Sequence, residues 1–83
     1  MAELKVGTVV YSAAGHDKGN MFVTVGLEGD FAFIADGNER KLEKPKRKRI
    51  KHLKITNTSL DMTKTLTDKE LRRIFSANKP QAR

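Results

Sequence analysis

The sequence predicts a small all-β protein, a closed or partly open barrel of five short strands followed by one short C-terminal helix. Three observations support this fold class. The 83 residues are enough for one domain. Apolar residues recur with a period of two between residues 4 and 55, in short runs separated by glycine-rich turns. Near the C-terminus the apolar period changes to that of a helix.

The first half of the chain contains three expected strands. Thr8–Ser12 is rich in residues that favour strands, and the glycines of residues 15–19 predict a tight loop after it. Apolar residues alternate over 21–26, which is typical of a strand with one buried face. After a turn at 28–30, Phe31–Ala35 is apolar on both faces. We therefore expect it to be the most buried strand, with its two phenylalanines in the core.

A hairpin and a last strand are expected next. Residues 36–38, Asp-Gly-Asn, tolerate positive φ and favour a tight turn, so residues 40–44 are the expected return strand with Leu42 pointing inward. Pro45 lacks a backbone N–H and marks an edge or a break. A last short strand then completes the barrel with apolar residues that point inward or cover its end, Ile50, Leu53 and Ile55.

The C-terminal third is expected to contain a linker and a helix. A helix is expected from Asp68 to about Ala77, because Thr67 and Glu70 form a capping box. Leu66 and Leu71 occupy the positions of a hydrophobic staple around this cap, and Leu71, Ile74 and Phe75 form an apolar stripe that packs either on the barrel or on a partner. The predicted organisation is a barrel domain at 1–56, a polar linker at 57–66, an amphipathic helix at 67–78 and a frayed tail at 79–83.

Positive charge is concentrated in residues 44–54, which we name the basic segment. The chain has 17 Lys and Arg against 10 Asp and Glu, for a net charge of +7. The basic segment holds seven of the 17 basic residues and no acidic one, which leaves ten of each sign elsewhere. A surface whose charges only keep the protein soluble carries positive and negative charges mixed together. A concentrated cationic patch therefore indicates a polyanionic partner.

The basic segment is the leading candidate for contacts with nucleic acid. Each Lys or Arg that neutralises a phosphate releases counterions, so affinity falls as salt rises. Arginine also makes bidentate and stacking contacts that lysine cannot make. The alternatives are a solvated basic loop and an anionic membrane surface, for which no amphipathic segment is present. The candidate contact residues are Lys44, Lys46, Arg47, Lys48, Arg49, Lys51, His52 and Lys54, with Lys18 from the glycine loop.

Residues 6–19, Val-Gly-Thr-Val-Val-Tyr-Ser-Ala-Ala-Gly-His-Asp-Lys-Gly, resemble the KOW motif, a strand, a loop with a key glycine and a second alternating strand. Residues 50–53 look like the corresponding stretch in one KOW branch, the large-subunit ribosomal proteins of archaea and eukaryotes with small bacterial KOW-domain RNA-binding proteins. The resemblance covers residues 4–56 and implies a five-stranded SH3-like barrel that contacts ribosomal or other structured RNA. Its motif residues are Gly7, Gly15, Asp17 and Gly19.

The glycine loop departs from this resemblance at two positions. Many KOW loops carry Lys or Arg where this chain has Asn20, and glycine where it has Phe22. The expected phosphate contacts therefore shift toward the basic segment. Phe22 lies on the opposite face from Met21 and Val23, so it would stack on a base if it were exposed.

The sequence contains no constellation that predicts an enzyme, a metal site or a cofactor. The absence of cysteine excludes disulfides and thiolate metal ligands. His16 and His52 are the only histidines, and no serine is placed as a nucleophile. No apolar run approaches the length that spans a membrane, and the N-terminus does not resemble a signal peptide, so a cytoplasmic location is expected.

These observations predict non-catalytic binding of structured RNA, with ribosomal RNA as the leading class. Phosphate contacts carry little sequence information, so recognition should depend mainly on RNA shape. The alternative is a protein-interaction module that docks on a ribosomal protein, a transcription factor or an RNA-processing factor through the stripe of Leu71, Ile74 and Phe75. Duplex DNA is a third possible partner, because phosphate charge alone does not distinguish the nucleic acids.

Overall fold

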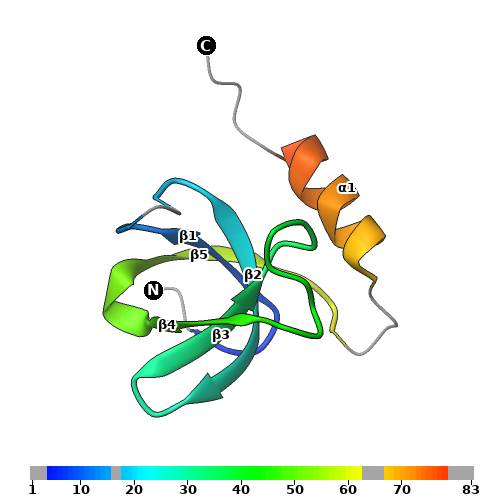
Figure 1. The fold of residues 1–83 in the computed structure, drawn as a ribbon. Helices are drawn as coiled ribbons and strands as arrows, with labels where there is room; N and C mark the ends of the chain where they lie inside the picture. Colours follow the sequence, from blue (N-terminus) through cyan, green and yellow to red (C-terminus); the bar gives the residue numbers. More distant parts are fainter. Residues whose placement is uncertain (1–3, 16–17, 63–66, 79–83) are drawn as a thin grey trace.

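The computed structural model describes residues 4–15, 18–62 and 67–78, which fold as a β-sheet covered by one helix (Figure 1). The predicted all-β class with one short helix is confirmed. The elements in chain order are β1 (Thr8–Ser12), β2 (Met21–Glu28), β3 (Phe31–Ala35), β4 (Lys46–Arg49), the 3₁₀ helix η1 (Ile50–His52), β5 (Leu53–Ser59) and α1 (Asp68–Asn78).

The sheet is antiparallel throughout and has the strand order β4-β3-β2-β1-β5. The strands at its two edges, β4 and β5, follow each other in the chain and are separated by only the three residues of η1. Because a three-residue connection cannot cross a flat five-stranded sheet, the sheet curls and brings its two edges together at η1. In the described residues no ladder joins β4 to β5, so the sheet is open on this side.

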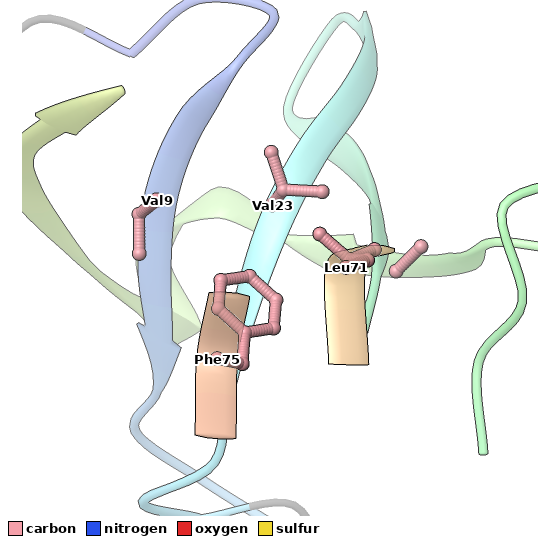
Figure 2. Packing of buried hydrophobic residues seen from close by; sticks show 5 residues of the cluster. Val9, Val23, Leu71 and Phe75 are labelled. Atoms are coloured by element: carbon pink, nitrogen blue, oxygen red, sulfur yellow. The ribbon is translucent and has the colours of Figure 1, made fainter. Parts of the chain in front are cut away.

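Both faces of the sheet are apolar, which produces two core clusters. The inner cluster consists of Val10, Phe22, Ala32, Ile34 and Leu53. The helix-side cluster consists of Val9, Val23, Ala35, Leu71 and Phe75. Figure 2 shows Leu71 and Phe75 of α1 beside the side chains of β1 and β2. The alternation in β2 therefore does not separate a buried face from a solvated one, because α1 covers the face that a bare sheet would expose.

Two aromatic residues of β3 do not lie where the sequence predicted. Ala32 and Ile34 are fully buried, as expected for a central strand. Phe31 and Phe33 point to the other face, are only half-buried, and belong to neither core cluster. Their expected place in the core is wrong, because α1 covers the helix-side face only beside Ala35 and leaves the far end of β3 open.

The predicted helix is confirmed to within one residue at its end. Thr67 and Glu70 form the capping box: the Glu70 amide donates to Thr67 Oγ1 at 3.1 Å, and the Thr67 amide donates to Glu70 Oε1 at 3.4 Å. Leu71 is fully buried, Phe75 is 9% exposed, and Ile74 packs against the helix-side cluster. The apolar stripe thus packs on the protein's own sheet. The staple partner Leu66 lies outside the described residues.

The predicted return strand at 40–44 is wrong. Residues 36–45 form a loop that is held against α1, and the neighbour of β3 is the basic strand β4. The Leu42 amide donates to Asp68 Oδ1 at 2.7 Å, and Arg72 donates to the Gly37 carbonyl. Leu42 accordingly packs on the helix-side cluster and not inside the curled sheet.

The boundary between barrel and linker also lies further along the chain than predicted. β5 continues to Ser59, so residues 57–59 belong to the sheet and not to a linker. Leu60 and Met62 then pack against the helix-side cluster. The predicted linker residues 63–66 and the tail 79–83 lie outside the described residues.

Candidate nucleic-acid interface

The basic segment lies at the edge of the sheet and in the turn that follows it (Figure 1). It includes all of β4, all of η1 and the first two residues of β5. In the described part of the chain, β4 pairs with β3 alone and so forms an edge of the sheet. Edge strands that carry charge resist pairing with other chains, and the same charge is accessible to a ligand from outside the sheet.

Two arginines of β4 lie on the same face as Phe31. The antiparallel register places Arg49 opposite Phe31 and Arg47 opposite Phe33, and opposite residues share a face. The guanidinium carbons of Arg47 and Arg49 are 4.3 and 5.1 Å from the centre of the Phe31 ring. Both distances lie within the range of about 6 Å in which a ring face attracts a cation. We name Phe31, Arg47 and Arg49 the arginine–aromatic cluster.

The two lysines of β4 point to the opposite face. Lys46 and Lys48 lie opposite Ile34 and Ala32 of the inner cluster, and both lysines are half-buried. Lys48 Nζ donates to the carbonyl of Ala14 at 2.9 Å. The basic segment therefore divides its charge between two faces of an edge strand, and Lys48 already has an acceptor within the protein.

The remaining predicted contact residues surround β4. Lys44 is exposed in the loop before it, Lys51 is exposed on η1, and Lys54 is exposed on β5 opposite Tyr11. The side chain of His52 is half-buried at the end of η1. The exposed side chains extend the cationic edge from β4 through η1 to the first residues of β5.

The two residues just before the predicted glycine loop contact the basic segment. The Ala13 amide donates to the His52 carbonyl at 2.8 Å, and the next residue accepts the bond from Lys48. The motif glycines Gly7, Gly15 and Gly19 all have positive φ, and Lys18 is exposed. Asp17 and His16 lie outside the described residues. The structure thus brings together two regions that are more than thirty residues apart in sequence.

Among the residues that the structure describes, no carboxylate neutralises the exposed cations of the basic segment. Within the described residues, no Asp or Glu forms an ion pair with Lys44, Arg47, Arg49, Lys51 or Lys54. Each of these side chains can therefore contact an anion without first breaking an ion pair of that kind. Residues 4–15, 18–62 and 67–78 contain no group of three or more His, Asp or Glu side chains that could hold a metal ion.

A groove of about 720 Å³ beside α1 is separate from the basic segment. It is open to solvent, shares no residue with the basic segment, and is lined by residues that include Tyr11, Asn20, Asp36, Arg72 and Phe75. Within the described chain its lining combines acidic, amide and aromatic side chains and contains no paired nucleophile and base.

Phe31 is the functional candidate that sequence reasoning missed. The sequence suggested Phe22 as a stacking residue, but Phe22 is 1% exposed and lies in the inner cluster, so that suggestion is wrong. Phe31 is instead a half-buried aromatic residue whose ring contacts two arginines of the basic segment. The shared two-residue spacing of Phe31 with Phe33 and of Arg47 with Arg49 is a signal for this contact, but it becomes useful only once β3 and β4 are known to pair.

Comparison with protein-family models gives no match to this chain, and comparison with curated proteins also gives none. In the described part of the chain, no helix has both the length and the apolar character needed to cross a membrane. Functional assignment therefore rests on the geometry and charge of the chain itself.

Proposed function

We propose that this protein is a non-enzymatic module that binds structured RNA along the cationic edge formed by β4, η1 and the start of β5. The observation that carries the proposal is the set of exposed cations, Lys44, Arg47, Arg49, Lys51 and Lys54, which lie on neighbouring elements without carboxylate partners among the described residues. Such an edge attracts a polyanion and gives an affinity that depends strongly on salt. Ribosomal or ribosome-associated RNA in the cytoplasm is the proposed target class.

The proposal includes a five-stranded SH3-like barrel of the KOW type. Support comes from the three-residue connection between the two edge strands, which draws the ends of the sheet together. Further support comes from the positive φ of Gly7, Gly15 and Gly19, the glycines on which the resemblance to KOW motifs rests. A solution structure with hydrogen-exchange data would test whether the barrel is closed. In a closed barrel, the backbone amides of β4 and β5 that face away from their sheet neighbours should be protected from exchange.

The experiment that tests RNA binding compares two triple variants with equal charge loss. The first, Arg47→Ala, Arg49→Ala and Lys51→Ala, removes exposed cations of the proposed edge. The control, Lys5→Ala, Lys69→Ala and Arg73→Ala, removes three exposed cations elsewhere. Lys48 stays intact in both, because its bond to Ala14 links β4 to the glycine loop.

The two variants should differ in the salt dependence of RNA affinity, measured by filter binding at several KCl concentrations. Each lost phosphate contact removes about 0.7 to 0.9 from the slope of log K against log salt, so the edge variant should lose roughly 2 to 3 units of slope. The control variant should keep a slope close to that of the native protein. Equal affinities for the native protein and the edge variant at moderate salt would contradict the proposal.

The protein-interaction alternative has lost its main sequence support, because Leu71 and Phe75 are buried against the protein's own sheet. Competition between matched RNA and DNA duplexes would separate the remaining nucleic-acid alternatives. In cells, crosslinking followed by sequencing of the attached RNA should recover ribosomal RNA or its precursors, with crosslinked peptides from residues 44–54.

A further inference from the structure

The arginine–aromatic cluster has a geometry that binding to phosphate alone does not require. Arg47 and Arg49 both lie over the ring of Phe31, Arg49 from the position directly opposite it and Arg47 from the position opposite Phe33. Two like charges on one ring repel each other, and neither has a carboxylate partner among the described residues. A contact with phosphate alone can also be made by a lysine, whose ammonium group acts as a point charge. The cluster therefore combines charge with two planar groups and an aromatic ring.

The two faces of β4 carry different basic residues, arginine on one face and lysine on the other. Arginine occupies the face with the half-buried aromatic ring of Phe31, and lysine occupies the face where Lys48 reaches a carbonyl. Guanidinium is planar and weakly hydrated, so it stacks on flat groups, whereas ammonium is a compact and strongly hydrated charge. Contact with Phe31 also holds both guanidinium groups in place before any ligand arrives, which lowers the entropy lost on binding.

We propose that the arginine–aromatic cluster is the stacking site for an unpaired RNA base, with the phosphates on either side held by the neighbouring cations of the edge. This inference rests on the proposed RNA binding and specifies which part of an RNA the edge selects. Bases in a duplex are stacked on each other and closed to such contacts, whereas bases in loops and bulges stack on aromatic rings and on arginine. The ligand is therefore a loop or bulge flanked by helix.

The environment of the cluster favours this occupant. Phe33, the next aromatic residue on the same face, lies against Gly26, where an added Cβ would be 3.4 Å from the Phe33 ring. Phe33 and Phe31 thus lie two residues apart on the same face of β3. Glu28 is the acidic residue opposite Phe31 in the register, and it is exposed at the end of β2. The two arginines outnumber this register partner of Phe31, so Glu28 does not cancel the positive charge of the cluster.

The test uses two variants that keep the charge or the apolar character of the cluster and remove its stacking groups. Arg47→Lys with Arg49→Lys keeps both charges, and Phe31→Leu keeps an apolar side chain. Arg73→Lys on the exposed face of α1 is the matched control. Each protein is titrated into two RNAs with equal numbers of phosphates, a hairpin with an unpaired loop and a fully paired duplex. The loop carries a fluorescent base analogue that reports stacking, and circular dichroism checks the fold.

The native protein and the control should prefer the hairpin. Both test variants should lose on the order of tenfold in hairpin affinity, keep their duplex affinity and lose the fluorescence change. Native-like preference for the hairpin in both variants would overturn the stacking site. If this result is found and the edge variant described above still loses RNA affinity, the stacking proposal is wrong but the proposed RNA binding stands. If that variant binds as the native protein does, the proposed function fails as well.

Discussion

At the scale of single residues, Thr24 is the least satisfied polar group of the described chain. Its side chain is fully buried on β2, and within the described residues its hydroxyl has no hydrogen-bond partner. A buried hydroxyl without a partner has lost its bonds to water and gained nothing in exchange. This position therefore lowers stability in a place where an apolar residue of the same shape would fit.

Thr24→Val should leave the free energy of unfolding unchanged or raise it by up to about 1 kcal/mol, because it removes only the unsatisfied hydroxyl. The matched control is Thr56→Val, which removes a hydroxyl that donates to the Val9 carbonyl at 2.6 Å. That control should lower the free energy of unfolding by about 1 kcal/mol. Urea titrations at pH 7 measure both values. A similar loss in the two variants would show that the Thr24 hydroxyl does have a partner.

Gly37 is the residue through which the 36–45 loop approaches the helix most closely. Its φ is +78°, and a Cβ at this position would overlap the carbonyl oxygen of Asp68. Gly29 also has positive φ, at +58°, but nothing lies within 4 Å of its added Cβ. Gly29→Ala should therefore destabilise by about 1 kcal/mol through the backbone alone. Gly37→Ala should destabilise by more, because α1 must move, and equal thermal shifts in the two variants would contradict this.

At the scale of elements, α1 is part of the core and not an appendage. Leu71 is fully buried between β2 and the 36–45 loop, which the helix binds through Asp68 and Arg72. Removing residues 66–83 would therefore expose the helix-side cluster. A loss of partner binding after this deletion would not identify α1 as the binding site, because the deletion also disrupts the core.

Leu71→Ala should lower the free energy of unfolding by about 2 to 5 kcal/mol, since it removes a fully buried side chain and leaves a cavity. The control Arg73→Ala changes an exposed residue on the same helix and should stay within about 0.5 kcal/mol of the native value. Thermal unfolding followed by circular dichroism measures both. If Leu71→Ala unfolded like the control, the helix would not be packed on the sheet in solution.

Local patterns predicted the elements that depend on local chemistry. Strand-forming residues identified β1, apolar alternation identified β2, and a short run that is apolar on both faces identified β3. The capping box placed the start of α1. The return strand was misplaced because the choice of neighbour for β3 depends on distant contacts. The Asp68 carboxylate binds the Leu42 amide across 26 residues and holds the 36–45 loop against α1. The basic residues carry no apolar alternation, so nothing local marks them as a strand.

The candidate site was predicted in composition but not in arrangement. The charge count identified residues 44–54, and the structure assigns them to the end of the 36–45 loop, β4, η1 and the start of β5. Side chains alternate between the two faces of a strand, so the sequence shows which cations share a face only after β4 is known to be a strand. The contact of Phe31 with Arg47 and Arg49 requires the pairing of β3 with β4, which joins residues nearly twenty positions apart.

At the scale of the whole molecule, the net charge of +7 is a source of instability in low salt. Raising KCl from about 0.01 to about 0.15 M shortens the screening length from roughly 30 to 8 Å, so the free energy of unfolding should rise. The rise should be smaller for the edge variant, Arg47→Ala, Arg49→Ala and Lys51→Ala, than for the control variant with the same net charge. Equal responses would show that repulsion is not concentrated in the basic segment.

The position of β1 between β2 and β5 has a consequence for how the chain is made. Synthesis proceeds from the N-terminus, so β1 can pair with β2 early. The other edge of β1 has no partner until residues 53–59, which form β5, have been added. The helix that covers the sheet arrives later still. In that interval the nascent chain carries a bare apolar face and an unpaired edge. The basic strand β4 is made just before β5, and a charged edge strand resists pairing with another chain.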